Sequence, residues 1–230
     1  MFPEHRHRSP QTGWERVIAY AFVAILVALF AAEIASDFRL EKLTAVFFLL
    51  AWIPLLFLHE FGHAIVAWAL GWYVGRIVVG FGKPVRTFQI GETQFEIRTF
   101  PLEGFVQCVP RNLKFPRTKN ALVYFAGPGV ELLLAGLLLI TIGPETLLGT
   151  PTQISTTALQ GLWGAAMVGA VLNLIPHSVA TENGRVPNDG LGILRSFFLP
   201  EHYFAEQIGT TYNPTTSDWE DHESADWWKR

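Results

Sequence analysis

The chain has 230 residues, of which half are hydrophobic and 16% are charged, and its formal net charge at pH 7 is −3. This small net charge, without a basic patch interleaved with aromatic residues, argues against a nucleic-acid partner. Cys108 is the only cysteine, so the sequence excludes an intramolecular disulfide and a cysteine-based metal cluster.

Four apolar runs are long enough to cross a bilayer, because about 20 helical residues span its hydrocarbon core. In chain order they cover residues 16–35, 44–72, 120–142 and 157–176. The first run is too long for a removed signal peptide and lacks a clear small-residue cleavage site. A shorter apolar helix at 190–199 is expected at the membrane interface. The sequence therefore predicts an α-helical polytopic membrane protein with about four transmembrane helices.

The loops between these runs differ strongly in their basic residues. The segment 73–119 contains eight Lys and Arg residues, whereas the segment between the third and fourth runs contains none. The positive-inside rule then places the 73–119 segment and both termini on the cytoplasmic side. We expect an integral multi-pass protein of the plasma membrane. We expect a cytoplasmic N-terminal segment (1–15), a membrane core (16–199) and an acidic, aromatic cytoplasmic tail (200–230). The end of this tail, DWEDHESADWWKR (218–230), is expected to be flexible.

A small, membrane-associated β region is expected between the second and third spans, at residues 73–117. Its β-rich runs are RIVVGFG, VRTFQIG, TQFEIRTF and GFVQCV, and Gly91-Glu92 forms a hairpin turn between two of them. A small sheet beside the membrane leaves an edge, which could pair with an extended peptide. A plain cytoplasmic cap is the alternative, and the sequence leaves both interpretations open.

The second apolar run contains HEFGH at residues 59–63, an H-E-x-x-H motif. On a helix, His59 and His63 face the same side, so both can bind one zinc ion. Glu60 lies beside them, where it can take a proton from a water molecule at the open position of the metal. Ionisable groups inside a span are costly and usually functional, which favours a metal site over histidines packed in a core.

A catalytic zinc site normally has three protein ligands and keeps one position for water, so a third ligand is expected elsewhere in the chain. The candidates near membrane depth are Glu131, His177, Glu182 and Asp189. Asn173, in the fourth run, is another buried polar group that could hydrogen-bond a neighbour or a substrate backbone. The pattern predicts a hydrolytic metal centre, and these residues alone do not identify which candidate is the third ligand.

The sequence resembles the site-2 protease family of intramembrane zinc metalloproteases over roughly residues 44–195. HEFGH is the first of four motifs that occur in the family's order. PLEGFVQ (101–107) is similar to the family's P-x-G-G-[YF]-V segment, and FAGPGVELLLA (125–135) is similar to its A-G-P-x-x-N-x-x-L-A span. NLIP (173–176) and NDG (188–190) are similar to its N-x-x-P…L-D-G element.

This resemblance implies a role for each matching residue. It makes His59, His63 and Asp189 the ligands of one Zn²⁺ per chain and Glu60 the general base. It makes Asn173 a residue that orients the substrate or stabilises the oxyanion. It also implies that the partner is a membrane-spanning protein, cut within or near its transmembrane helix to release a regulator or to clear a remnant.

Three departures from the family pattern stand out. Glu103 takes the place of the first glycine of P-x-G-G, and Glu131 takes the place of the usual asparagine. Asp189 follows Pro176 by 13 positions, a longer spacing than is usual in the family, which makes His177 the rival third ligand. There is also no room for the PDZ or CBS modules of many relatives, so we expect a minimal catalytic core.

Two other functions compete with proteolysis. A non-catalytic zinc-binding scaffold could hold client helices in the membrane, although a structural zinc site has no need of a base at Glu60 and would take four protein ligands. A transporter or channel could use intramembrane charges as an ion path, but the chain shows no inverted-repeat pattern. The sequence favours the enzyme.

Overall fold

The computed structural model describes residues 28–181, 184–208, 210–213 and 218–221. The expected N-terminal segment, 1–15, and most of the first expected span lie outside the described residues, although residues 28–36 are helical. Among the described residues, three helices are long and apolar enough to cross a membrane. The expected count of four spans therefore stays a prediction.

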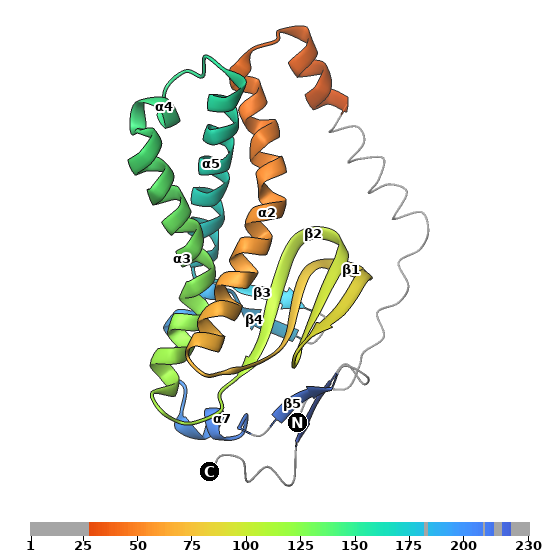
Figure 1. Ribbon diagram of the computed structural model, residues 1–230, viewed down its shortest axis with the longest axis vertical. Coiled ribbons are helices and arrows are strands. Elements are labelled where there is room, and N and C mark those ends of the chain that lie inside the picture. The colour runs from red at the N-terminus through yellow and green to blue at the C-terminus, as the bar shows by residue number, and fades with distance from the viewer. Residues whose placement is uncertain (1–27, 182–183, 209, 214–217, 222–230) are drawn as a thin grey trace.

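The three helices are α2 (Leu40–Ala69), α3 (Pro116–Ile142) and α5 (Ile154–Leu174). They agree with the last three predicted spans in position and apolar character. The short helix α4 (Pro144–Leu148) lies between α3 and α5 in the chain. The long helices lie side by side along the longest axis of the molecule, as Figure 1 shows. This bundle is the frame that holds the candidate site.

Small residues let these helices approach one another closely. A Cβ atom built on Gly62 of α2 would lie 2.7 Å from the carbonyl oxygen of Ala126 in α3. One built on Gly161 of α5 would lie 2.6 Å from the Cβ atom of Phe47 in α2. Close backbone approach at small residues is typical of helix packing in membranes, where apolar side chains alone give little driving force for association.

The predicted β region is a bent hairpin of β1 (Tyr73–Ile90) and β2 (Thr93–Val109), with its turn at Gly91-Glu92. Residues 76–79 have backbone partners on two sides, in 104–107 and in 94–97, because both strands fold over. The four β-rich runs thus form one small sheet with 84–90 and 104–109 as its outer segments.

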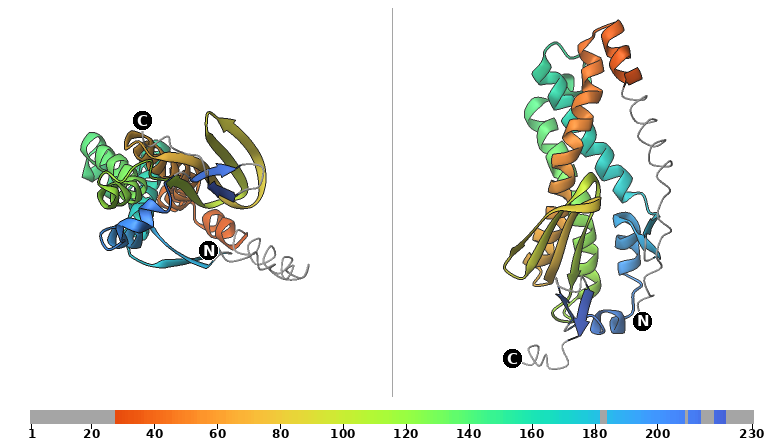
Figure 2. Two further views of the ribbon diagram at one scale, coloured as in Figure 1. Left: turned by 90° about the horizontal axis from the view of Figure 1, so that it is seen from below. Right: turned by 90° about the vertical axis from the view of Figure 1, so that its right-hand side faces the viewer.

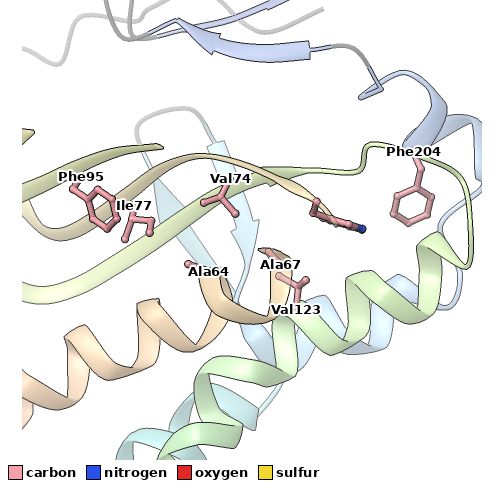
Figure 3. Packing of buried hydrophobic residues seen from close by; sticks show 8 residues of the cluster. Ala64, Ala67, Val74, Ile77, Phe95, Val123 and Phe204 are labelled. Carbon is pink, nitrogen blue, oxygen red and sulfur yellow. The ribbon is translucent and has the colours of Figure 1, made fainter. Parts of the chain in front are cut away.

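The sheet packs against the second half of α2. Val74 and Ile77 of β1 and Phe95 of β2 form one buried cluster with Ala64 and Ala67 of α2 (Figure 3). The alanines give the strands room to lie close to the helix. This contact fixes β2 beside the part of α2 that contains HEFGH.

The chain after α5 forms short elements. A hairpin of β3 (Ser178–Thr181) and β4 (Gly184–Pro187) precedes α6 (Asp189–Ser196), which covers most of the predicted apolar helix. In the right-hand view of Figure 2, the β1–β2 sheet and the α6 segment lie on opposite sides of α2. Both the β1–β2 sheet and the start of α6 therefore approach the part of α2 that contains residues 59–63.

The described part of the 200–230 tail forms short elements, and of its end, 218–230, the structure describes only residues 218–221. It contains α7 (Glu201–Ala205) and the hairpin of β5 (Thr210–Asn213) and β6 (Asp218–Asp221). Phe204 of α7 is fully buried in the cluster that includes Val123 of α3 (Figure 3). A single aromatic anchor thus ties the start of the tail to the bundle.

Candidate metal centre

Helix α2 presents the motif residues on a buried face. The helix continues through Pro54, five residues before the motif, so His59 and His63 keep their helical spacing of four. The exposed fractions of His59, Glu60 and His63 are 5%, 4% and 7%. Such burial of three ionisable side chains in an apolar helix is costly unless they have partners or a bound ion.

The third predicted ligand comes from a distant part of the chain. Asp189 is the first residue of α6, and its Oδ2 atom lies 3.0 Å from Nε2 of His59. Its Oδ1 atom lies 3.4 Å from Nε2 of His63, and the two Nε2 atoms are 3.1 Å apart. Among the described residues, these three are the group whose ligand atoms converge closely enough to hold one metal ion.

These distances fit a tetrahedral metal ion. Ligand atoms about 2.0–2.2 Å from zinc lie about 3.3–3.6 Å from one another in that geometry. The two Nε2 atoms are 3.1 Å apart, and the two oxygens of Asp189 lie 3.0 Å from one of them and 3.4 Å from the other, which is near this range. Two imidazoles and one carboxylate with an open position form the donor set of many hydrolytic zinc sites, and the same set can bind non-haem iron. The residues present therefore fit a catalytic metal ion.

The outer ring nitrogens of both histidines have polar neighbours. Nδ1 of His63 lies 2.6 Å from the carbonyl oxygen of Val123, which can only accept, so this nitrogen carries the proton and donates. The Nε2 atom of neutral His63 then presents its lone pair to the cluster. Nδ1 of His59 lies 3.3 Å from Oε2 of Glu131, whose side chain is buried. Both rings are thus turned with Nε2 towards the metal position.

Glu60 lies under strand β2. A Cβ atom built on Gly104 would lie only 2.6 Å from Oε1 of Glu60, so a larger residue there would have to displace the Glu60 side chain. The Oε2 atom of Glu60 is buried and has no hydrogen-bond partner within the described part of the chain. Glu103, which replaces the first glycine of P-x-G-G, precedes Gly104 in the chain and is exposed. The second glycine of that motif, Gly104, is the one that lies against Glu60, and this sequence retains it.

Gly127 of α3 packs directly on the cluster. A Cβ atom at this position would lie 2.3 Å from Nε2 of His63 and 2.5 Å from Nε2 of His59, within the space that a metal ion needs. The backbone of α3 thus forms one wall of the metal position, and a methyl group on Gly127 would occupy space beside both imidazole nitrogens.

We expect Gly127→Ala to lower zinc affinity at least tenfold, because the added methyl group overlaps both Nε2 atoms. The measurement is zinc per purified chain after dialysis against a weak chelator. Gly136→Ala is the matched control in the same helix, since a Cβ atom there meets nothing within 4 Å. Full zinc content in Gly127→Ala would contradict the assigned metal position.

The structure keeps the other predicted site residues out of the cluster. His177 is exposed, and its Nδ1 atom faces the carbonyl oxygen of Ile175 at 2.9 Å. The side-chain amide of Asn173 donates to the carbonyl oxygen of Gly169, one turn earlier in α5. Glu131 contacts His59 on the ring edge away from Asp189. Glu182 lies outside the described residues.

Two residues that shape the cluster, Gly127 and Asn188, were not predicted as site residues from the sequence. Gly127 lies in the motif GPG, which could have drawn attention as small residues within an apolar helix. Asn188 precedes Asp189 and caps α6 through its Oδ1 atom, which accepts from the backbone N–H of Leu191. Asn-Asp-Gly is typical of a turn, and nothing in the sequence indicated that this asparagine is buried.

Comparison with known proteins adds a family match. The model of Peptidase family M50 matches residues 47–214. The matched stretch contains both histidines of HEFGH, Glu60 and Asp189, so it covers the whole cluster.

Three relatives show the range of similarity. A protein of Neisseria meningitidis serogroup A, named as a candidate zinc metalloprotease, is 32% identical over 173 residues, which are 60% of this chain and 39% of that protein. The zinc metalloprotease Rip1 of Mycobacterium bovis is 32% identical over 111 residues, 42% of this chain and 28% of Rip1. The zinc metalloprotease RasP of Bacillus licheniformis is 38% identical over 64 residues, 28% of this chain and 15% of RasP. This chain thus spans about two fifths or less of the length of these relatives.

Proposed function

Since the chain belongs to peptidase family M50, the site-2 protease family, we propose that it is a zinc-dependent intramembrane endopeptidase. The observation that carries this proposal is the convergence of His59, His63 and Asp189 on one point beside Glu60, within a bundle of apolar helices. A non-catalytic scaffold would gain nothing from a buried carboxylate with an unpartnered oxygen next to the metal position.

Each residue near the cluster has a distinct task in the proposed reaction. His59, His63 and Asp189 hold the metal, and a bound zinc ion would polarise the scissile carbonyl and acidify the attacking water. Glu60 accepts the proton of that water and passes it to the leaving amide nitrogen. The carbonyl oxygen of Val123 orients the imidazole of His63 by accepting from its outer nitrogen, and the Glu131 carboxylate lies 3.3 Å from the outer nitrogen of His59.

Asn173 remains our candidate for orienting the substrate or stabilising the oxyanion. Its amide has two N–H groups, and one of them donates to the carbonyl oxygen of Gly169. The side chain lies on α5, where a Cβ atom built on Gly169 would lie 3.0 Å from Oε1 of Glu131. Asn173 is therefore one helical turn from the residue that faces the carboxylate beside His59. We propose that its amide turns toward the substrate backbone.

The substrate in this proposal is a transmembrane helix that opens locally. A helical peptide bond has its carbonyl in an internal hydrogen bond, so the segment must unwind before attack. The β sheet has two outer segments, 84–90 and 104–109. The second of them starts at Gly104, which lies close to the Glu60 side chain. An extended peptide paired with that edge would pass beside the proposed base. The proposed setting is the plasma membrane, with both termini in the cytoplasm.

The test uses a fusion of two soluble reporter domains joined by one transmembrane helix with a central Gly-Gly or Ala-Ala pair. Opening the Gly-Gly helix costs about 2 kcal/mol less, at about 1 kcal/mol per residue, so we expect about 30-fold faster cleavage. Fragment formation by detergent-purified protein is followed on gels. A zinc chelator should stop the reaction, and added zinc should restore it.

Three results would count against the proposal. Cleavage that continues in excess chelator would exclude the metal as a participant. Zinc binding with no cleavage of either fusion would favour the scaffold. Equal cleavage of the Gly-Gly and Ala-Ala fusions would leave the protease intact and remove the requirement for local unwinding.

A further inference from the structure

Asn188 joins the ends of two helices through one buried side chain. Its exposed fraction is 8%, and it lies between hairpin β3–β4 and α6. Its Nδ2 atom lies 2.9 Å from the carbonyl oxygen of Asn173 and 2.8 Å from that of Ile175, at the C-terminal end of α5. These carbonyls lack helical partners, so the amide caps α5.

The other end of the same amide caps α6. Oδ1 of Asn188 accepts from the backbone N–H of Leu191 at 3.1 Å and from that of His177 at 2.9 Å. Nδ2 also lies 3.0 Å from Nδ1 of His177, but that ring nitrogen faces the carbonyl oxygen of Ile175 and donates to it. The two N–H groups of Asn188 are therefore used by the carbonyl oxygens of Asn173 in α5 and of its C-cap residue, Ile175.

This double cap fixes the origin of α6, where Asp189 is the first residue. The two helix ends also touch directly, since a Cβ atom on Gly190 would lie 2.1 Å from the carbonyl oxygen of Leu174. The position of Asp189, as the first residue of this short helix, depends on where α6 starts and on the direction of its axis. Asn188 therefore determines where the third ligand of the cluster lies.

The same residue closes the inserted hairpin. The backbone N–H of Asn188 donates to the carbonyl oxygen of His177 at 3.0 Å, and Ser178 and Pro187 form the first register pair of β3–β4. The residues between His177 and Asn188 therefore leave the bundle and return at one point. The long gap before Asp189 does not displace the ligand, because the hairpin absorbs the extra residues.

We propose that Asn188 is the positioning residue for Asp189, and that it acts together with the base of hairpin β3–β4. The residue stands where the L-D-G element has leucine, and leucine can neither cap α5 nor cap α6. The inference rests on the proposed function only in taking Asp189 as the third metal ligand. The side-chain amide of Asn188 and the base of hairpin β3–β4 together place that ligand.

The experiment is a zinc competition titration with a chromogenic chelator, on the full chain purified in detergent. We expect Asn188→Leu to weaken zinc binding about 10–100-fold, as the loss of a ligand's supporting hydrogen bonds does elsewhere. Asn188→Asp keeps the oxygen that caps α6 and loses both donors, so an intermediate loss is expected. Asn112→Leu is the matched control, because Asn112 also caps a backbone N–H but is exposed.

A double-substitution cycle separates positioning from general damage. If Asn188 acts through Asp189, then Asn188→Leu should change zinc affinity less than twofold in an Asp189→Ala background. A merely structural role would lower affinity in both backgrounds, and this would overturn the inference. The d–d spectrum of the cobalt-substituted protein gives a second readout, since a displaced carboxylate should alter it in Asn188→Leu and leave it unchanged in Asn112→Leu.

The outcomes also distinguish this inference from the proposed function. No zinc binding by the wild type would refute the metal centre itself. Zinc binding that depends on Asp189 but stays within threefold of wild type in both Asn188 variants would refute the positioning role alone. If Asn188→Leu fails to fold, the Asn188→Asp titration and its cycle with Asp189→Ala decide the question.

Discussion

Replacing Glu60 by Gln is expected to lower the rate of peptide cleavage about 10²–10⁴-fold while leaving zinc bound. Glutamine has the shape of glutamate but cannot take a proton from water, so only the base is removed. The carboxylate is buried under Gly104, where an isosteric amide fits without moving strand β2. The measurement pairs initial cleavage rates of the reporter fusion with zinc per chain.

Glu145→Gln is the matched control, because Glu145 is exposed in α4 and takes no part in the cluster. It should cleave at the wild-type rate. Cleavage by Glu60→Gln within tenfold of wild type would rule out the general-base role. Loss of zinc together with activity would instead make Glu60 part of the metal's support, and the base would have to be sought elsewhere.

Asp189→Ala is expected to remove most of the bound zinc, from about one ion per chain to less than about a tenth, and with it all measurable cleavage. Two neutral imidazoles remain, and two ligands do not form a catalytic zinc site. Glu131 cannot replace the lost carboxylate, because it faces Nδ1 of His59 whereas Asp189 faces Nε2 of the same ring. Metal content by mass spectrometry and cleavage rates measure the effect.

His177→Ala tests the rival assignment in the same experiment. His177 is exposed and its ring is bonded to the carbonyl oxygen of Ile175, so zinc content should stay at the wild-type value. Loss of zinc in His177→Ala, with retention in Asp189→Ala, would transfer the third ligand to His177 and contradict the geometry of the cluster.

The sequence predicted those features that depend on local periodicity. Three spans, the Gly91-Glu92 turn and the shared face of His59 and His63 each follow from neighbours within a few residues. Hydropathy, turn chemistry and helical spacing carry that information directly. The first span falls largely outside the described residues, and the local signal for it is of the same kind as for the others.

The rest of the site depends on long-range packing, which a single sequence does not encode in readable form. Asp189 lies 130 residues after His59, and only the family resemblance pointed to it. Gly127 matters because of two side chains on another helix, and Asn188 matters because of carbonyls on α5. The long gap before Asp189 favours His177 as a rival ligand in the sequence, whereas in the structure the closed base of hairpin β3–β4 returns the chain to Asp189.

The distance along the chain between the ligands has a consequence for biosynthesis. A growing chain emerges with its N-terminal residues first, so both histidines of α2 can enter the membrane while α6 has yet to be made. The carboxylate of Asp189 arrives only after α3 and α5 have been synthesised. An unfinished chain therefore lacks the carboxylate of the His59, His63 and Asp189 cluster until α3 and α5 have been synthesised.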